Sequence, residues 1–230
     1  MGKNLTKQRK NAVVIGATGN LGRAVCAELK KAGFNLDKTW LSANHPDATR
    51  PESYKNLPKK IHLAVYLPGL NIVKKIEDLE IEEWDKVMDV NLKGAFLFAK
   101  AAFPALKAAK GATLLVISSI MTTHPYPNRL PYAVSKAGLE GFTRSLAIDW
   151  GQHNIAVNCI RLGHLVGLMK STRTNPELLR EVRANTPSGE LVDPMEVAKY
   201  IVWLASGGSK SLTGSIVDFD HAYTLNRWPL

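Results

Sequence analysis

The fold of this chain is decided by the stretch Ala12-Val-Val-Ile-Gly16-Ala-Thr-Gly19-Asn-Leu-Gly22-Arg-Ala24. The apolar residues Ala12–Ile15 predict a buried strand, and the glycines lead directly into a segment with helical periodicity. Glycines permit a tight turn and a close backbone approach, and the N-terminus of the following helix attracts a pyrophosphate. The stretch therefore predicts a strand, a phosphate-binding turn and a helix, with a purely structural turn as the alternative.

The rest of the chain alternates apolar runs with helix-like segments. Predicted strands are Ala12–Ile15, Lys38–Ala43, His62–Leu67, Thr113–Ser118, Ile155–Ile160 and Ser215–Phe219. Predicted helices are Leu21–Ala32, Ile81–Leu106, Pro131–Asp149, Pro176–Ala184 and Pro194–Leu204. This alternation predicts a parallel sheet wrapped by helices on both faces, which is a three-layer doubly wound α/β fold. We expect a flexible basic tail over residues 1–10 and one domain over residues 11–230.

Composition and charge limit the function classes. The 230 residues are 45% hydrophobic and include two cysteines, Cys26 and Cys159, in apolar contexts without metal-ligand spacing. We interpret both as reduced core residues of a cytoplasmic protein, and we expect no metal site. No apolar stretch approaches the roughly 18 residues of a membrane span, so no membrane partner is expected. The net charge of +10 fits an anionic cofactor or substrate, and because the basic residues are scattered, nucleic acid is the least favoured partner.

A second pattern indicates proton chemistry. Tyr132-Ala-Val-Ser-Lys136 places a phenol and an ammonium four residues apart, on one face of a predicted helix. An ammonium beside a phenol lowers the phenol pKa from about 10, which favours a general acid or base. Ser119 follows the apolar run Ala112-Thr-Leu-Leu-Val-Ile117, so we expect its hydroxyl at the C-terminal tip of a strand, where parallel sheets bind ligands. Ser118 is the alternative if the register shifts by one residue.

The glycine turn, Ser119, Tyr132 and Lys136 together resemble the short-chain dehydrogenase/reductase family, including its typical Ser-to-Tyr spacing. Further segments similar to family landmarks extend the resemblance over almost the whole chain: Asp89-Val-Asn91-Leu-Lys-Gly-Ala95, Asn158-Cys-Ile-Arg-Leu-Gly163 and Asp193-Pro-Met-Glu-Val-Ala198. The resemblance implies a Rossmann fold and an NAD(P)(H)-dependent oxidoreductase, of the class EC 1.1.1.-, that interconverts a carbonyl and an alcohol.

The resemblance also implies residue roles. Tyr132 would exchange a proton with the substrate oxygen, and Lys136 would lower the Tyr132 pKa and bind the nicotinamide ribose. Ser119 would hold the carbonyl or alcohol, and Asn91 would anchor a water in a proton relay. The cofactor-binding positions carried over from the family are Gly16, Thr18, Gly19, Asn20, Leu21, Gly22, Asp47, Pro68, Gly69, Tyr132, Lys136, Gly163 and Leu165.

The cofactor half departs from the family pattern. Asn20 stands where the middle glycine is usual, and Tyr66-Leu67-Pro68-Gly69 replaces an Asn-Asn-Ala-Gly segment. The stretch from Trp40 to Leu67 is shorter than in the family, so we expect one strand–helix unit to be trimmed or absent. No acidic residue ends the predicted strand near Ser42, where an acid would bind ribose hydroxyls, and this favours NADP(H) over NAD(H).

Two segments are expected on the substrate side. The loop Met121–Pro131 connects Ser119 to Tyr132, and three of its side chains suit a small polar or anionic substrate: His124, Tyr126 and Arg129. The segment Leu168–Leu191 is similar to the family's substrate lid. Its cations would receive a carboxylate, a phosphate or an acidic carrier protein, unless they only form a solvated helix face: Arg173, Arg180 and Arg183.

Two other functions remain open from the residues alone. One is a non-redox enzyme, such as an isomerase, cyclase or lyase, that uses Tyr132 as its acid or base. The other is a catalytically inactive binding or scaffold subunit, which the altered segment Tyr66–Gly69 motivates. The family resemblance further implies a homodimer or homotetramer formed through the long helices Ile81–Leu106 and Pro131–Asp149.

Overall fold

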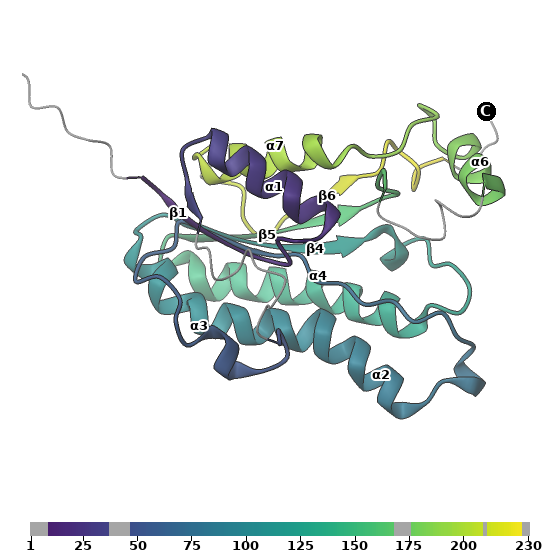
Figure 1. The fold of residues 1–230 in the computed structure, drawn as a ribbon, viewed down its shortest axis with the longest axis horizontal. Coiled ribbons are helices and arrows are strands. Elements are labelled where there is room, and N and C mark those ends of the chain that lie inside the picture. The colour runs from purple at the N-terminus through teal and green to yellow at the C-terminus, as the bar shows by residue number, and fades with distance from the viewer. Residues whose placement is uncertain (1–8, 37–46, 168–175, 209–210, 227–230) are drawn as a thin grey trace, which may run out of the picture.

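The computed structural model describes residues 9–36, 47–167, 176–208 and 211–226. Its centre is a parallel sheet of six strands in the order β2-β1-β3-β4-β5-β6. The strands are β1 (Asn11–Ile15), β2 (Asn35–Leu36), β3 (Leu63–Tyr66), β4 (Ala112–Ser119), β5 (Ile155–Leu162) and β6 (Ile216–Phe219). The predicted three-layer, doubly wound α/β fold is confirmed (Figure 1).

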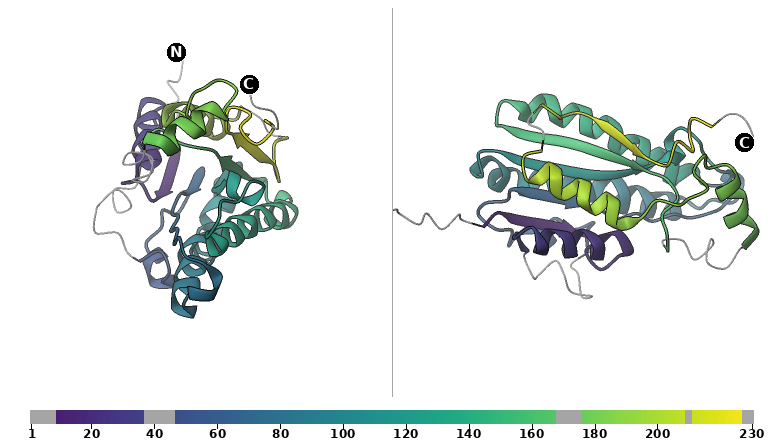
Figure 2. Two further views of the ribbon diagram at one scale, coloured as in Figure 1. Left: turned by 90° about the vertical axis from the view of Figure 1, so that its right-hand side faces the viewer. Right: turned by 90° about the horizontal axis from the view of Figure 1, so that it is seen from above.

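Helices cover both faces of the sheet (Figures 1 and 2). One face carries α1 (Asn20–Lys31) and α7 (Pro194–Ala205), which lie side by side. The opposite face carries α2 (Ile81–Met88), α3 (Gly94–Ala108) and α4 (Leu130–Gly151). Helix α6 (Pro176–Ala184) lies beyond the C-terminal ends of the strands, and short 3-10 helices stand at η2 (Pro51–Tyr54), η3 (Ile76–Asp78) and η5 (Ile120–Thr122).

The two cores follow from the alternation of side chains along each strand. On β1, Ala12 and Val14 pack toward α1 and α7, whereas Val13 and Ile15 pack toward α3 and α4. All four are at most 5% exposed. Burial on both faces explains why the strands are continuous apolar runs in the sequence, as parallel sheets require.

The N-terminal edge of the sheet is short. Strand β2 contains only Asn35–Leu36, whose partners are Asn11 and Ala12 of β1. The strand predicted over Lys38–Ala43 lies outside the described residues. Within the described residues between β2 and β3 there is a single 3-10 helix and no strand.

Two segments differ from the sequence predictions, namely the long predicted helix and the predicted N-terminal tail. The predicted helix Ile81–Leu106 is not one regular helix, because the π-helical turn η4 (Asp89–Lys93) separates α2 from α3. Of the predicted flexible tail, residues 1–8 lie outside the described residues, but Lys10 is held in place. Its Nζ donates to the carbonyl oxygen of Ala205 at 2.9 Å, and its own carbonyl accepts from the backbone of Asn35.

Candidate active site

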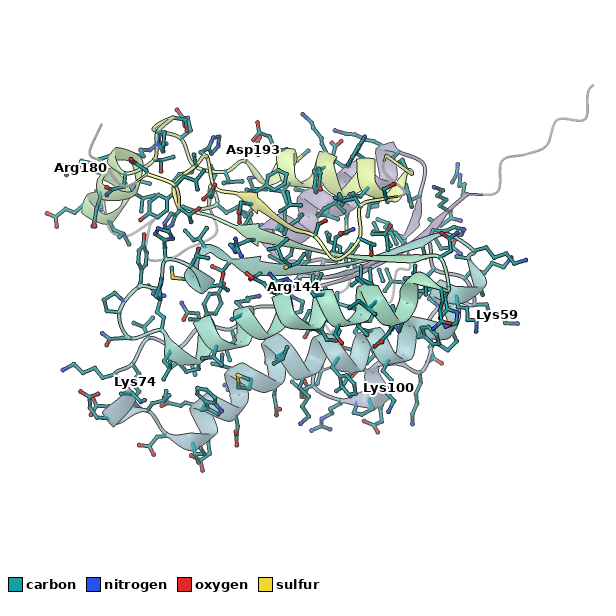
Figure 3. All side chains as sticks on the ribbon, turned by 180° about the vertical axis from the view of Figure 1, so that it is seen from behind. Lys59, Lys74, Lys100, Arg144, Arg180 and Asp193 are labelled. Carbon is teal, nitrogen blue, oxygen red and sulfur yellow. The ribbon has the colours of Figure 1, made fainter. Side chains whose placement is uncertain are left out.

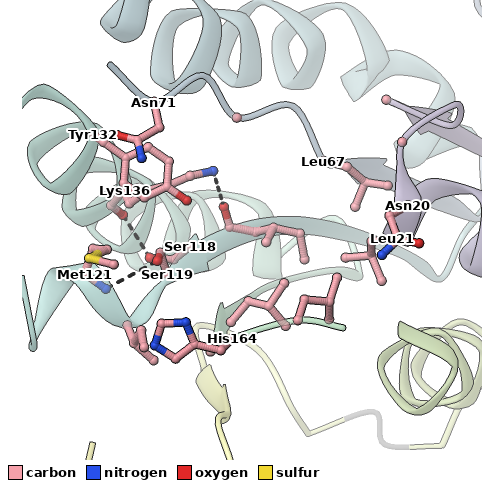
Figure 4. Close-up of a pocket in the computed structure, with 18 of the residues that line it drawn as sticks. Asn20, Leu21, Leu67, Asn71, Ser118, Ser119, Met121, Tyr132, Lys136 and His164 are labelled. Carbon is pink, nitrogen blue, oxygen red and sulfur yellow. Dashed lines mark hydrogen bonds between the residues drawn. The ribbon is translucent and has the colours of Figure 1, made fainter. Parts of the chain in front are cut away.

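A cavity of about 330 Å³ lies at the C-terminal edge of the sheet (Figure 4). It spans the boundary between β1 and β3, where the strand order reverses and parallel sheets bind ligands. The predicted site residues that line it are Gly16, Gly19, Asn20, Leu21, Gly22, Gly69, Ser119, Tyr132, Lys136, Gly163 and Leu165. The fold therefore brings the glycine turn and the proton-transfer residues to one cavity.

Tyr132 stands in the first turn of α4 beside Ser119, whose Oγ accepts from the backbone of Met121 at 3.3 Å. Burial raises the pKa of the Tyr132 phenol, although a hydrogen bond with Ser119 and the charge of Arg129 oppose that rise. The expected lowering of this pKa by Lys136 is wrong for this arrangement. The Lys136 ammonium lies over the ring, and because burial raises the phenol pKa, the phenol is protonated at neutral pH.

Lys136 is almost fully buried, with 2% of its surface exposed. Its Nζ donates to the carbonyl oxygen of Ile117 at 2.8 Å and lies 3.5 Å from the carbonyl oxygen of Pro68. Burial lowers the pKa of the ammonium to about 8. Gly69 leaves room for it, since a Cβ on Gly69 would stand 3.3 Å from Nζ.

The hydroxyl of the neighbouring Ser118 interacts with helix α4 and not with Tyr132. It donates to the backbone carbonyl oxygen of Lys136 at 3.1 Å and to Oε1 of Glu140 at 3.0 Å. Both serines border the cavity, but the Ser118 hydroxyl ties strand β4 to helix α4. Ser119 is thus the serine whose side chain interacts with Tyr132.

A buried ionic network fixes α4 against the sheet. Arg161 of β5 binds both carboxylate oxygens of Glu140 at 2.9 Å and also reaches Oδ1 of Asp218 on β6 at 2.9 Å. Thr122 donates to Glu140 at 2.8 Å. Burial disfavours the Glu140 carboxylate, but the hydrogen bonds from Arg161, Thr122 and Ser118 outweigh it and hold the Glu140 pKa below its ordinary value. The sequence pattern did not single out this network.

Asn91 lies behind the cavity and does not line it. In the π-helical turn η4 it is fully buried, and its Oδ1 accepts from the backbone of Leu70 at 2.7 Å. Its Nδ2 donates to the Leu70 carbonyl at 2.9 Å and to Ser135 Oγ at 2.8 Å, while Ser135 Oγ donates to the carbonyl oxygen of Tyr132. Asn91 therefore connects the loop after β3 to the turn of α4 that carries Tyr132.

Three predicted cofactor positions do not line the cavity, namely Thr18, Asp47 and Pro68. Thr18 is exposed in the glycine turn, where its carbonyl oxygen accepts from Arg23 Nη1 at 2.6 Å. Asp47 accepts from the backbone and hydroxyl of Thr49 and borders a separate surface groove beside α2. The structure therefore does not bring Asp47 to the glycine turn.

A cluster of polar rings borders the substrate side. The hydroxyl of Tyr126 lies 2.9 Å from Nε2 of His164 and 2.7 Å from the hydroxyl of Tyr223. Burial, followed by the charge of Arg129, lowers the pKa of His164 to about 4, so this imidazole is neutral. Of these rings, sequence reasoning found only Tyr126, although the position of His164 directly after Gly163 at a strand end was an available signal.

The other predicted substrate residues do not meet at the cavity. The His124 side chain contacts only the neighbouring Thr123 hydroxyl among the hydrogen bonds of the described residues. Arg180 is exposed on α6 (Figure 3), and Arg183 binds the carbonyl oxygen of Gly189 at 2.7 Å. Arg173 lies outside the described residues.

The glycine turn fits the phosphates of a dinucleotide cofactor. Gly16 has φ +83°, and a Cβ on Gly22 would stand 2.2 Å from the carbonyl oxygen of Gly16. Among the described residues, no side chain caps α1 and no acid lies in its first turn, so its N–H groups can receive an anionic group. Asn20 Nδ2 donates to the carbonyl oxygen of Val166 at 2.6 Å and connects the turn to the segment after β5.

Within the described residues, no group of three or more His, Cys, Asp or Glu side chains is placed to hold a metal ion. No helix of this part of the chain is long and apolar enough to cross a membrane.

A doubly wound sheet with a glycine turn and a Ser/Tyr/Lys group at one cavity defines a class of nucleotide-binding α/β proteins, and comparisons identify the family. The family model described as enoyl-(acyl carrier protein) reductase matches residues 52–224. An uncharacterized oxidoreductase from Thermotoga maritima is 34% identical, over 72% of this chain and 68% of that protein. A tropinone reductase homolog from Arabidopsis thaliana is 27% identical, over 94% of this chain and 93% of that protein.

Solved structures agree with the sequence comparisons. The crystal structure of gox2181 has a TM-score of 0.85 and 27% identity, covering 94% of this chain and 96% of that one. The chain belongs to the short-chain dehydrogenase/reductase family, whose matched relatives are dehydrogenases and reductases.

Proposed function

We propose that this protein is an NAD(P)(H)-dependent oxidoreductase that interconverts a carbonyl and an alcohol on a small-molecule substrate. The observation that carries the proposal is the meeting of Ser119, Tyr132 and Lys136 in one cavity with the glycine turn. The relatives support the same reaction class, since they include a glycerol dehydrogenase, an acetoacetyl-CoA reductase and a D-beta-hydroxybutyrate dehydrogenase.

In the reducing direction, the bound nicotinamide supplies a hydride to the carbonyl carbon. Tyr132 donates the proton to the carbonyl oxygen, because burial keeps its phenol protonated at neutral pH. The Ser119 hydroxyl orients the same oxygen, and the positive charge of Lys136 stabilises the phenolate that Tyr132 leaves behind. In the oxidising direction the phenolate takes the alcohol proton.

The reaction is tested by comparing Tyr132→Phe with Tyr200→Phe. Tyr200 lies on α7, stacks on Trp203 and does not line the cavity, so it serves as the matched control. Removing a general acid should lower turnover about 100- to 10,000-fold while NAD(P)H still binds, and Tyr200→Phe should keep its turnover. Failure of the wild-type protein to bind either nicotinamide at millimolar levels would contradict the proposal. Substrate conversion without a change in nicotinamide absorbance would instead establish a non-redox enzyme.

A preference for NADP(H) over NAD(H) is also part of the proposal. Arg23 places a cation at the rim of the glycine turn, where the Thr18 carbonyl oxygen holds its guanidinium. The cation Arg50, in contrast, is paired with Asp47 at 3.5 Å. Fluorescence titration should give at least a tenfold lower Kd for NADPH than for NADH, with the ratio reduced in Arg23→Gln. Equal affinities for the two nicotinamides would refute the preference.

We further propose a cytoplasmic homodimer or homotetramer. The buried free thiols of Cys26 and Cys159 suit a reducing compartment. An apolar groove between α3 and α4 suits a second copy of the chain, and Phe96 at its border is 49% exposed. Light scattering should give a mass that is a multiple of the 25.2 kDa chain, and Phe96→Glu should shift it toward the monomer.

A further inference from the structure

Two side-chain atoms of the described residues are buried without any hydrogen-bond partner. They are Oδ1 of Asn71 and Nε of Arg129. Buried polar atoms are almost always paired, since an unpaired one costs about 1–3 kcal/mol. An orphan acceptor and an orphan cationic donor in one region therefore indicate a place that a polar ligand completes.

Both orphan atoms belong to segments at the catalytic end of the cavity. Asn71 lines the cavity and lies beside Tyr132 in the close-up (Figure 4). Arg129 directly precedes α4, one helical turn before Tyr132. The two segments are joined, because the backbone of Lys74 donates to the carbonyl oxygen of Asn128 at 2.9 Å. The loop after β3 and the loop before α4 thus form one wall.

Arg129 forms no ion pair with another described residue, although its side chain is half-buried. The charge of Glu181, like that of Arg129, acts on Tyr126. Burial is the largest influence on the pKa values of Tyr132, Tyr126 and His164. The Arg129 cation additionally lowers each of these three pKa values, which places the Arg129 charge among these groups. The neighbouring rings are neutral and pair with one another, so they do not compensate it.

We propose that Arg129, with Asn71 of the adjoining loop, forms the subsite that binds a carboxylate of the substrate. The guanidinium presents parallel N–H donors that match the two oxygens of a carboxylate. Asn71 Oδ1 accepts a hydrogen bond from a donor group of the bound molecules. The inference rests on the proposed oxidoreductase function and assigns its substrate class, which is the oxo acids and the corresponding hydroxy acids.

The test compares acids with their uncharged esters. Acetoacetate and phenylglyoxylate are measured beside their methyl esters, with NADPH and NADH, in wild type, Arg129→Gln, Arg129→Lys and Arg144→Gln. Arg144 is the matched control because it lies on α4, the helix that Arg129 precedes, with a 58% exposed side chain (Figure 3). Wild type should prefer the acids at least tenfold in kcat/KM. Arg129→Gln should lose about 30-fold on the acids and stay unchanged on the esters, while Arg129→Lys should keep part of the preference.

The outcomes distinguish failure of the carboxylate subsite from failure of the proposed oxidoreductase function. Turnover of the esters without a preference for the acids, or a preference that survives Arg129→Gln, overturns the subsite and leaves the oxidoreductase intact. If neither nicotinamide binds, the function fails, and benzoate still tests the subsite. Benzoate in about tenfold excess over its Kd should raise the Tm of the wild type by about 3 °C, with no such rise for benzamide or in Arg129→Gln. Equal shifts in both proteins would refute the subsite.

Discussion

The ammonium nitrogen of Lys136 lies over the ring of Tyr132, 5.6 Å from the ring centre. In this position the cation faces the π surface of the phenol and donates its hydrogen bond to a backbone carbonyl. The ammonium is close enough to stabilise a Tyr132 phenolate, but it does not itself deprotonate the phenol. This arrangement supports the proposed proton donation by Tyr132, and it has consequences for stability as well as for turnover.

The buried lysine should make stability rise with pH. The Lys136 pKa is about 8 in the folded protein and 10.5 as a reference value, so between these values the unfolded chain binds more protons. Below pH 8 both states are charged and the full burial penalty applies, and above it the penalty fades. Relative to Lys136→Met, wild-type stability should gain about 2 kcal/mol between pH 7 and pH 9.5. Urea unfolding without added nicotinamide measures this gain, and a pH-independent difference would exclude it.

The glycine turn should not tolerate a methyl group at Gly22. A Cβ there would stand 2.2 Å from the Gly16 carbonyl oxygen and 2.7 Å from Ala17 Cα, so the turn must open. Gly22→Ala should lower the nicotinamide affinity and destabilise the protein by about 1–3 kcal/mol. Gly141→Ala is the control, since nothing lies within 4 Å of its Cβ inside α4, and it should stabilise by about 0.5–1 kcal/mol. Fluorescence titration and thermal unfolding distinguish the two variants.

The ionic network should contribute measurably to stability. Glu140→Gln leaves Arg161 with Asp218 as its carboxylate partner and should cost about 3 kcal/mol, because Glu140 is only 6% exposed. Asp89→Asn, which breaks an exposed pair with Lys93, should cost less than about 1 kcal/mol.

The Glu140 effect should also depend on pH in a defined direction. The folded-state pKa of Glu140 lies below its reference value of 4.5, so its contribution is complete above that pH. It is lost as the pH falls through the folded-state pKa. The stability gap between wild type and Glu140→Gln should therefore narrow in acid, and a gap that widens below pH 4.5 would contradict this assignment.

Asn91 should act through the loop that it holds. In Asn91→Ala the backbone N–H and carbonyl of Leu70 lose their partner, which should cost about 1–3 kcal/mol and loosen Gly69 beside Lys136. We expect a raised KM for the nicotinamide together with a lower kcat. Asn35→Ala, which removes only an exposed contact to Asn11, should change neither. A loss of stability with unchanged kinetic constants would show that Asn91 is only structural.

The sequence could predict the elements that repeat a simple period or spacing. Strands such as β4 are continuous apolar runs, and the four-residue spacing of Tyr132 and Lys136 places them on one helix face. The orientation of Lys136 relative to the phenol depends on where Ile117 presents its carbonyl oxygen, which no local pattern encodes. The same limit applies to Asn71 and Arg129, whose loops are joined by a backbone hydrogen bond between segments far apart in the chain.

The π-helical turn at Asp89–Lys93 makes this fold sensitive to insertions and deletions at a place that does not line the cavity. One residue of an α-helix corresponds to a rotation of about 100°, so removing a single residue from this turn would swing Asn91 away from Leu70. Every side chain lining the cavity would keep its identity, yet the loop that carries Gly69 and Leu70 would lose its support. Insertions and deletions near Asn91 are thus more informative about activity than substitutions there. Relatives of this protein can be sorted by whether they keep the same number of residues in this turn, which sets the direction in which the Asn91 side chain points.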